Sequence, residues 1–371
     1  MLNVLHVSDT HLGYRQYHSE QRRKDFSDAF DESIGIAIEE NVDAVLHTGD
    51  LFHSKNPNLK TRIEAIRIIK KLENENIPFL AIVGNHERKR DEQFLDEFNM
   101  ALDNIVKLGE ESPWVKGNVA IHGFDFIPPT QWNTTDLSLE DVGADVNIVC
   151  MHQLVDPPVP ELFNPHKADN MVERFGIDVD AVALGDYHER GGNYIDGTYF
   201  YYPGSTEMTS KDEPHQKYVS LLQLNGDESF VEFDRKIETR QFVTVNVHLN
   251  EEDGAADQIR TNLELYDLKD TVVHLNVSGA DVPISVSKMK ELIDNCGALV
   301  SRVNDERSYN QEIEAIDYEA KDIESTIDDE LSENGISEIG YKIDDIVRDT
   351  ESVKKSHVRS EVKELMEEES P

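Results

Sequence analysis

Residues 2–13 of the chain read Leu-Asn-Val-Leu-His-Val-Ser-Asp-Thr-His-Leu-Gly, in which a β-prone run leads directly into Asp9-Thr10-His11. Three later apolar runs also end in short polar motifs. They are Ala44–His47 before Gly49-Asp50-Leu51-Phe52-His53, Phe79–Val83 before Gly84-Asn85-His86-Glu87, and Ala181–Leu184 before Gly185-Asp186-Tyr187-His188. Continuous apolar runs of this kind are typical of strands in a sheet that is covered on both faces. We therefore predict an α/β fold.

The polar residues after these strands are expected to converge on one site. Open α/β sheets bind ligands in the crevice beyond the carboxyl ends of their strands. Carboxylate, amide and imidazole groups without thiolates suit Mn²⁺, Mg²⁺ or Fe²⁺ better than a structural zinc ion. A carboxylate shared by two metals is the usual arrangement for hydrolysing phosphate esters, and Asp50 is the candidate for it. The sequence thus predicts a two-metal phosphoesterase.

Each motif also has a simpler interpretation. A single Asp-x-His or Gly-Asp pair is usually turn chemistry or a helix cap. The metal interpretation is favoured because several such turns recur in order, each after an apolar run. The other histidines match no motif, and His6 and His47 lie inside strand runs, so we interpret them as packing or surface residues.

The ordered motifs resemble a known family. Asp-x-His, Gly-Asp-x-x-His, Gly-Asn-His-Glu, the strand-end pair Met151-His152 and Gly-x-x-His are similar to the calcineurin-like metallophosphoesterases. The segments Ser8–Gly13 and Gly49–His53 narrow the resemblance to the Mre-eleven (bacterial SbcD) DNA-repair nucleases. It implies an α/β two-sheet metallophosphoesterase sandwich with a small α+β capping domain and a C-terminal helical hairpin.

The resemblance also implies roles for individual residues. One metal would be held by Asp9, His11, Asp50 and His188, and the second by Asp50, Asn85, His152 and Asp186. His86 resembles the group that protonates or steadies the leaving oxygen, and His53 the residue that contacts the scissile phosphate. We further expect Glu87 to orient His86.

The last motif departs from the family pattern. The family usually has Gly-His-x-His there, whereas this chain has Asp186 in place of the first His. Because Asp can ligate a hard divalent ion, we expect the second metal to be retained, with a stronger preference for oxygen-loving metals. The alternative is a weakened or lost second metal.

The net charge of −39, from 36 basic and 75 acidic residues, argues against a nucleic-acid partner, which normally requires a basic surface. The distribution softens this objection. Residues 1–110 carry only −6, so the rest of the chain carries −33. Basic residues follow the motifs, and Arg15, Arg88 and Arg90 are candidate DNA-binding residues, although any one of them alone would be a solvated loop residue.

Acidity spread over a chain with 38% hydrophobic residues resembles proteins from a cytoplasm with molar salt, as in halophilic archaea. The Debye length falls to about 3 Å at 1 M salt, so general repulsion from DNA is largely screened. The sequence has no apolar stretch of 18 residues and no charged-then-apolar leader, which predicts a soluble cytoplasmic protein that does not enter a membrane.

The domain organisation is expected to be a nuclease domain at residues 1–238, a capping domain for DNA at 239–304 and an acidic helical hairpin at 305–371. Three strand runs are predicted to complete a second sheet of the first domain, at Tyr194–Tyr202, Tyr218–Leu224 and Ser229–Ile237. Short β–α–β–α–β units follow from Arg240, at Phe242–Leu249, Ala255–Leu265, Val272–Val277, Val286–Asn295 and Leu299–Val303.

Two features suggest partners. The predicted hairpin has apolar stripes and little core of its own, and in the family this segment binds the coiled-coil Rad-fifty-type ATPase. Two predicted helices, with apolar residues from Ile63 to Leu72 and from Phe94 to Ile105, offer more apolar surface than a sheet edge needs. Core packing is the common explanation, but the corresponding helices form the family's homodimer, so we predict a dimer.

We therefore predict a manganese-dependent DNA nuclease with two Mn²⁺ per chain, Mg²⁺ or Fe²⁺ being possible. It would act as a 3′–5′ double-strand exonuclease and single-strand endonuclease in double-strand-break repair, together with the ATPase. Two alternatives remain open. One is a phosphatase or phosphodiesterase that acts on small substrates, and the other is a non-catalytic repair scaffold with a decayed site.

Overall fold

The structure is a computed structural model that describes residues 2–89, 93–108, 113–225 and 229–307. The predicted hairpin, apart from residues 305–307, and Arg90 lie outside the described residues.

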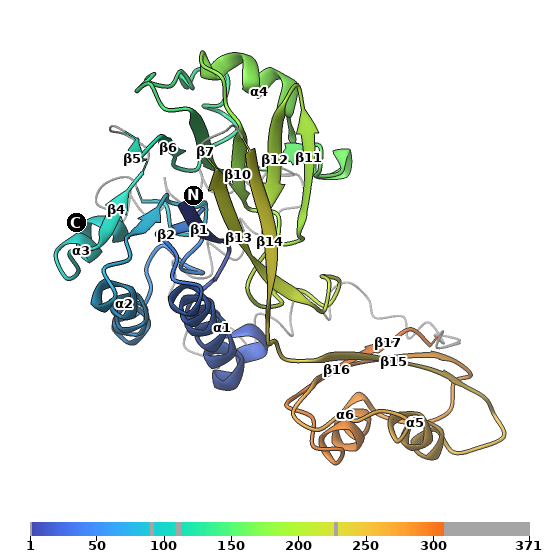
Figure 1. Ribbon diagram of the computed structural model, residues 1–371. Coiled ribbons are helices and arrows are strands. Elements are labelled where there is room, and N and C mark those ends of the chain that lie inside the picture. Colours follow the sequence, from blue (N-terminus) through green and yellow to red (C-terminus); the bar gives the residue numbers. More distant parts are fainter. Residues whose placement is uncertain (1, 90–92, 109–112, 226–228, 308–371) are drawn as a thin grey trace, which may run out of the picture. The chain divides into compact units, whose positions relative to one another are not determined.

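Two six-stranded sheets form the larger part of what is described (Figure 1). The first has the order β14 (Ser229–Ile237), β13 (Lys217–Asn225), β1 (Leu2–Val7), β2 (Ala44–His47), β3 (Phe79–Ala81), β4 (Ile105–Lys107). The second has the order β11 (Gly191–Ile195), β12 (Thr198–Tyr202), β10 (Ala181–Gly185), β7 (Val146–His152), β6 (Val119–Phe124), β5 (Trp114–Lys116).

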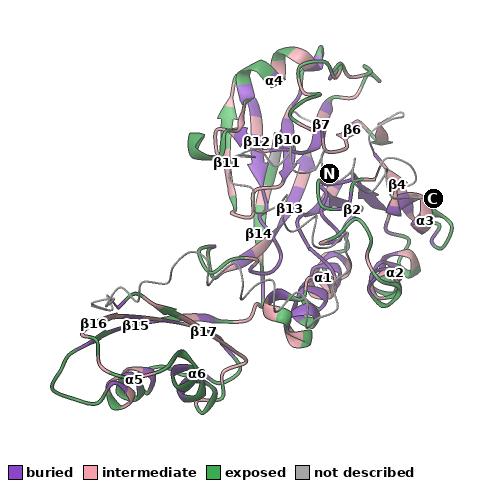
Figure 2. Ribbon diagram, turned by 180° about the vertical axis from the view of Figure 1, so that it is seen from behind, coloured by how far each residue is buried: buried purple, intermediate pink, exposed green. Residues whose placement is uncertain are grey.

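The two sheets pack face to face because their central strands are apolar on both faces. In β1, Val4 packs in the core between the sheets, whereas Leu5 and Val7 face the outer helices. Ile148 and Ala183 of the second sheet join Val4 in that inner core. Figure 2 shows the corresponding band of buried residues along the strands. This arrangement confirms the predicted α/β class with two sheets.

Helices cover the outer faces. The first sheet is covered by α1 (Glu20–Glu39), α2 (Leu59–Asn74) and α3 (Phe94–Asn99), and the second by α4 (Ala168–Phe175) (Figures 1 and 2). Ser19 caps α1 by accepting a hydrogen bond from the Arg22 amide at 3.3 Å, and Asn58 caps α2 in the same way. The shorter elements are η1 (Gln16–His18), η2 (Glu161–Phe163), β8 (Val155–Asp156) and β9 (His166–Lys167).

The strands after the last motif differ from the prediction in two ways. β13 and β14 extend the first sheet, because β13 pairs antiparallel with β1, with Leu5 opposite Leu221. The run at 194–202 is divided between β11 and β12, because Asp196 and Gly197 form a turn with positive φ angles of 49° and 94°. Of the three strand runs that were predicted to complete the second sheet, only the first, which forms β12 and part of β11, therefore belongs to it.

The apolar segments considered for dimerisation are largely used inside the chain. Leu72 of α2 and Phe94, Leu95 and Phe98 of α3 are buried in the core beneath the first sheet. The second segment is not one helix, since α3 ends at Asn99 and Ile105 lies in β4. Core packing accounts for these residues. Leu59, Ile63 and Met100 remain exposed.

A smaller three-stranded parallel sheet follows, as the pattern predicts. It is built from β15 (Phe242–Leu249), α5 (Ala255–Leu263), β16 (Val272–Gly279), α6 (Val286–Asp294) and β17 (Val300–Asp305). Residues of both helices and of the strands share one core of their own. None of the helices in the described part of the chain combines the length and apolar character that a membrane span requires.

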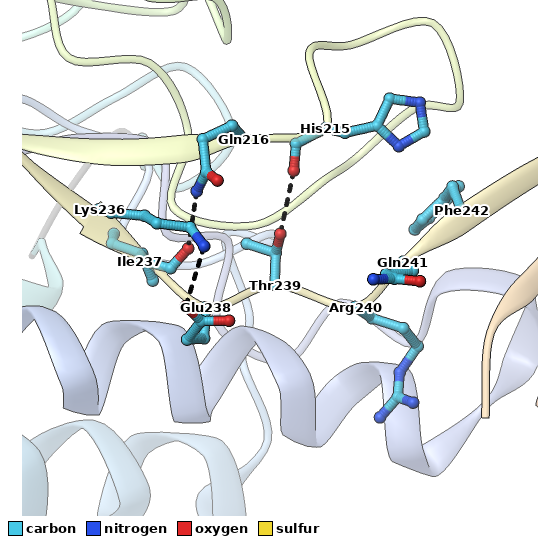
Figure 3. Close-up of a pocket in the computed structure, with 9 residues that line it drawn as sticks. All are labelled: His215, Gln216, Lys236, Ile237, Glu238, Thr239, Arg240, Gln241 and Phe242. Atoms are coloured by element: carbon cyan, nitrogen blue, oxygen red, sulfur yellow. Dashed lines mark hydrogen bonds and ion pairs between the residues drawn. The ribbon is translucent and has the colours of Figure 1, made fainter. Parts of the chain in front are cut away.

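The segment that joins the sheets to this smaller unit is held by ionic contacts. Arg240 donates two hydrogen bonds to the carboxylate of Asp25 in α1, at 2.5 and 2.7 Å. Figure 3 shows Arg240 at the edge of a hollow of about 360 Å³, where Thr239 also donates to the His215 carbonyl and Gln216 to the Ile237 carbonyl. This hollow contains none of the predicted site residues.

The two histidines inside strands are buried, in keeping with the packing interpretation. The ring of His6 lies against Tyr201, and its Nε2 is 2.8 Å from Thr48 Oγ1. Burial, with the nearby His47, lowers the pKa of His6 from 6.5 to about 3. The folded protein therefore keeps His6 neutral at pH values where the unfolded chain protonates it.

This difference predicts acid sensitivity. With a folded pKa below the unfolded value, the contribution of His6 to stability is fully present above about pH 6.5 and is lost as the pH falls towards 3, by up to about 1.4 kcal/mol per pH unit. His6→Phe retains a ring against Tyr201 and should make the pH dependence of the unfolding free energy shallower by about that amount. Denaturant unfolding between pH 6.5 and 4, with a metal chelator present, measures this, and an unchanged slope would contradict it.

Candidate metal centre

Side chains from both sheets meet beyond the carboxyl ends of β1, β2, β7 and β10. Three groups have potential ligand atoms that all lie within 4.8 Å of one another. The groups are Asp9 with His11 and His188, Asp9 with Asp50 and His152, and His11 with His53 and His86. The structure therefore brings residues of every predicted motif to one place.

The backbone at this place is strained. Asp9, His11, Asp50 and Asp186 all have positive φ, at 51°, 45°, 55° and 88°. A non-glycine residue in this region costs of the order of 1–3 kcal/mol, and such residues cluster at functional sites. Their recurrence in the predicted ligands indicates that the fold holds these side chains in place against a local cost.

Motif glycines permit the close approach of these segments. A Cβ atom on Gly84 would lie 2.1 Å from Asp50 Oδ1, and one on Gly49 would lie 2.5 Å from His152 Nδ1. Gly49 also has a φ of 97°, which side chains rarely adopt. The Gly-Asp and Gly-Asn pairs in the sequence are thus explained by space as well as by turn geometry.

One half of the cluster consists of Asp9, His11, Asp50 and His188. The Nε2 atoms of His11 and His188 are 3.1 Å apart. Asp50 Oδ2 lies 3.9 Å from His11 Nε2, and Asp9 Oδ1 lies 3.9 Å from His188 Nε2. Four groups thus direct their donor atoms towards one small volume, as ligands of a single cation do.

The other half is formed by Asp50, Asn85, His152 and Asp186. His152 Nε2 lies 3.5 Å from Asp50 Oδ1 and 3.7 Å from Asp186 Oδ1. Asn85 Nδ2 donates to Asp186 Oδ1 at 3.1 Å. Asp50 therefore faces both halves through its two oxygens, as expected of a bridging ligand.

These residues fit a pair of divalent metal ions. His152 Nε2 is fully buried and has no hydrogen-bond partner, although buried polar atoms rarely go unsatisfied. Its other nitrogen, Nδ1, is 2.8 Å from the Thr48 carbonyl, which makes Nδ1 the donor and leaves the Nε2 lone pair directed into the cluster. Buried carboxylates and imidazoles arranged in this way require a compensating positive charge, which bound cations can supply.

The electrostatics of the apoprotein express the same requirement. Burial, together with the charge of Asp50, raises the pKa of Asp9 despite nearby imidazoles. Burial also opposes ionisation of Asp50, but His152 and His11 outweigh it and hold the pKa of Asp50 well below its usual range. Burial and the neighbouring His188 lower the pKa of His11. His11 is thus kept in the neutral form that binds metals.

Two histidines stand at the accessible side of the cluster. The His86 side chain is 42% exposed, its Nδ1 lies 3.1 Å from the His53 carbonyl, and its Nε2 lies 3.9 Å from Asp50 Oδ2. Burial and His86 lower the pKa of His53 to about 4, and its ring stacks on Tyr14 at a centroid distance of 3.8 Å. Both rings lie against the ring of His11, at centroid distances of 5.3 Å for His53 and 5.1 Å for His86.

The expected role of Glu87 is wrong. Its carboxylate accepts hydrogen bonds from the backbone amides of Phe52 and Gly84, at 2.9 and 3.2 Å, and is buried. It therefore fixes the two motif loops to one another, and the His53 carbonyl orients His86 instead. Burial and the charge of Asp50 raise the pKa of Glu87 to about 8.

Two of the three candidate DNA-binding arginines, Arg15 and Arg88, lie among the described residues. Arg15 is exposed and forms an ion pair with Glu20 at 2.8 Å, and Arg88 is exposed near Gln131. Arg90 is outside the described residues. These positions leave their DNA-binding role a prediction.

Sequence reasoning missed three residues that support the predicted ligands, one beside a motif and two in a distant loop. Ser8 Oγ donates to Asp9 Oδ2 at 2.7 Å, and His188 Nδ1 lies 2.8 Å from Thr209 Oγ1 and 3.1 Å from Glu213 Oε1. Ser8 adjoins a motif and could have been inferred. Thr209 and Glu213 lie in an acidic loop with no motif, so no local pattern identifies them.

Comparison with known proteins agrees with this geometry. The family model for calcineurin-like phosphoesterases matches residues 2–190. The chain is 35% identical to the DNA double-strand break repair protein Mre11 of Haloferax volcanii over 99% of this chain and 82% of that protein. It is 35% identical to Mre11 of Halobacterium salinarum over 94% of this chain and 90% of that protein. It is 30% identical to Mre11 of Sulfolobus acidocaldarius over 85% of this chain and 84% of that protein.

The position of Asp50 predicts the effect of its removal. Asp50→Asn takes away the charge that faces both halves of the cluster and should reduce bound Mn²⁺ from two ions per chain to one or none. Elemental analysis after dialysis measures the stoichiometry. Asp31→Asn, which removes an exposed carboxylate paired with Lys71, is the matched control and should retain both ions. Two ions bound with unchanged affinity in Asp50→Asn would contradict the bridging assignment.

Proposed function

The chain belongs to the calcineurin-like phosphoesterases and, within them, to the Mre11 family of DNA double-strand break repair proteins, and we propose that it is a manganese-dependent DNA nuclease. One observation carries this proposal: five side chains place their potential ligand atoms close together. They are Asp9, His11, Asp50, His152 and His188. The family makes the protein a metal-dependent phosphodiesterase. The DNA substrate rests on the relatives' names.

We assign two metal positions to the cluster. Asp9, His11, Asp50 and His188 would hold one ion, and Asp50, Asn85, His152 and Asp186 the other. The second position offers three oxygen-bearing side chains and one imidazole, which favours Mn²⁺. Mg²⁺ and Fe²⁺ have similar ligand preferences and are the alternatives. Such a pair of ions activates a water molecule and stabilises the oxygens of an in-line displacement at phosphorus.

His86 is the proposed proton donor to the leaving oxygen. Its Nδ1 can donate to the His53 carbonyl, which leaves Nε2 on the side of Asp50. When the ring is protonated, Nε2 carries the proton that the leaving oxygen needs, and the fixed Nδ1 contact keeps the ring facing the reacting group. His53, stacked on Tyr14 beside His11, would contact the non-bridging oxygens of the scissile phosphate.

The remaining parts of the proposal concern domains and partners. We propose a nuclease domain at 1–238, a capping domain for DNA at 239–304 and a segment at 305–371 that binds a Rad-fifty-type ATPase. Exposed Leu59, Ile63 and Met100 support a homodimer through α2 and the end of α3. We expect cleavage to proceed 3′ to 5′ on duplex ends and endonucleolytically on single strands, in the cytoplasm.

The proposal predicts a clear separation between metal binding and catalysis. His86→Ala should reduce cleavage by about 10²–10⁴-fold, the range for loss of a general acid, while two Mn²⁺ remain bound. Cleavage of end-labelled duplex and single-stranded DNA in molar KCl with Mn²⁺, alongside metal analysis, tests this. His215→Ala, at an exposed histidine, is the control.

The outcomes distinguish the alternatives. Full turnover by His86→Ala would remove the proton-donor assignment. If the natural protein cleaves a small chromogenic diester but no DNA, the nuclease proposal fails in favour of a small-substrate phosphodiesterase. No cleavage of either substrate would leave a scaffold that does not catalyse.

The substitution at position 186 predicts a change in metal preference. Asp186→His replaces an oxygen donor by a nitrogen donor, so the affinity for Mn²⁺ relative to Zn²⁺ should fall by about tenfold, equivalent to about 1.4 kcal/mol. Competition between the two ions, followed by metal analysis, measures the ratio. If the natural protein holds one ion and Asp186→His holds two, Asp186 is not a working ligand.

A further inference from the structure

The loop between β12 and β13 passes beside the metal centre. Ser205 forms an isolated β-bridge with Ser8, the residue before Asp9, and the Ser205 amide donates to the His188 carbonyl at 3.2 Å. Thr209 and Glu213 of the same loop reach Nδ1 of the His188 ring. A segment without any motif is therefore attached to a predicted metal ligand at both its backbone and its side chain.

Glu213 is held in place by a buried lysine. Lys217, the first residue of β13, donates to Glu213 Oε2 at 2.6 Å, to Ser205 Oγ at 2.9 Å and to the His188 carbonyl at 3.1 Å. These three bonds use all three protons of the ammonium group. The side chains of Lys217 and Glu213 are 3% and 9% exposed, so water does not compete for these contacts.

The geometry fixes which nitrogen of His188 carries a proton. Thr209 Oγ1 donates its proton to Glu213 Oε1, and an ionised carboxylate can only accept hydrogen bonds, so in a neutral His188 ring the nitrogen that faces this pair, Nδ1, carries the proton. The lone pair is then on Nε2, which faces His11 Nε2 at 3.1 Å and Asp9 Oδ1 at 3.9 Å. Metal-binding histidines are commonly oriented by a carboxylate in this way, which also makes the imidazole a stronger donor.

The ionic pair is not explained by stability alone. Removing two charges from water costs several kcal/mol per ion, and buried pairs are often no more stabilising than apolar residues of similar volume. Here the pair contacts a predicted ligand directly.

The other histidine ligands have different partners. His152 Nδ1 faces a backbone carbonyl, and His11 Nδ1 lies 3.4 Å from His53 Nδ1. Neither arrangement supplies a negative charge to the ring. The carboxylate behind His188 therefore makes the two metal positions unequal, because it strengthens one ligand of the Asp9–His11–Asp50–His188 position.

We propose that Glu213 is a positioning residue that orients His188 and strengthens divalent-ion binding at that position, with Lys217 fixing Glu213 in turn. The inference rests on the proposed metal centre but does not depend on the DNA substrate. Glu213 acts through His188 and is not itself a ligand.

The proposal is tested by titrating the apoprotein with Mn²⁺. The electron paramagnetic resonance signal of free Mn²⁺ measures how much of the ion remains unbound. Glu213→Gln should weaken one of the two sites by about 10–100-fold, the range for loss of an outer-shell partner, and leave the other unchanged. Asp212→Asn is the matched control, since it neutralises the adjacent exposed carboxylate of the same loop and should bind as the natural protein does.

A double-mutant cycle separates positioning from general structural damage. In a His188→Ala background, Glu213→Gln should have no further effect on Mn²⁺ affinity, because its target is gone. Equal effects in both backgrounds, or unchanged affinity in Glu213→Gln, would overturn the proposal. Should Glu213→Gln fail to fold because it leaves Lys217 unpaired, Glu213→Gln/Lys217→Met removes both charges and should show the same weakened site. Two Mn²⁺ bound without any DNA cleavage would contradict the nuclease function and leave this inference intact.

Discussion

The metal centre depends on a single electrostatic constraint, which is that two carboxylates and several imidazoles share a volume from which water is largely excluded. Asp9, Asp50 and His152 are essentially unexposed. Burying uncompensated charge is costly, and a group in this position normally neutralises itself, pairs with another charge or binds a metal. The positive φ angles of the ligands and the absence of a Cβ at Gly49 and Gly84 are needed to bring these groups together. Two bound divalent metal ions would compensate this negative charge and make the arrangement favourable.

The sequence could predict that these side chains meet because parallel strands place their carboxyl ends at one edge of a sheet. Each predicted ligand lies one to four residues beyond a strand or at its last residue, as His152 does in β7, so local pattern and topology together predicted its position. The same reasoning could not assign β13 and β14 to the correct sheet. Their alternating residues suit any half-covered sheet, and the pairing of β13 with β1, which brings β14 along with it, depends on a contact across more than 200 positions in sequence.

The supporting residues were beyond sequence reasoning for a related cause. Glu213 and Lys217 look like an ordinary charged loop in an acidic chain, and only the folded path brings them to His188. Glu87 illustrates the opposite error, since its position beside His86 suggested a contact that the backbone does not allow. Adjacent residues in a tight turn point in different directions, and Glu87 turns inward to the amides of Phe52 and Gly84 while His86 turns outward. Proximity in sequence was therefore a poor guide to the contacts around the ligands.

The ion pairs within the chain affect how such an acidic protein could bind DNA. Several basic residues are used internally: Lys217 binds Glu213, and Arg22 is fully buried between Asp25 and Glu207. Arg15 forms an ion pair with Glu20. Lys217 and Arg22 are not free to neutralise phosphates, whereas Arg15 stays exposed, so the basic surface available for DNA is smaller than the composition alone suggests. Under the proposed function, the positive charge that meets the scissile phosphate would come mainly from the metal centre. Such attraction acts over contact distances and is weakly screened, whereas repulsion from the surface acts over longer distances and falls away in molar salt. The net charge of −39 and a polyanionic substrate are therefore compatible when the ligands of the centre are filled.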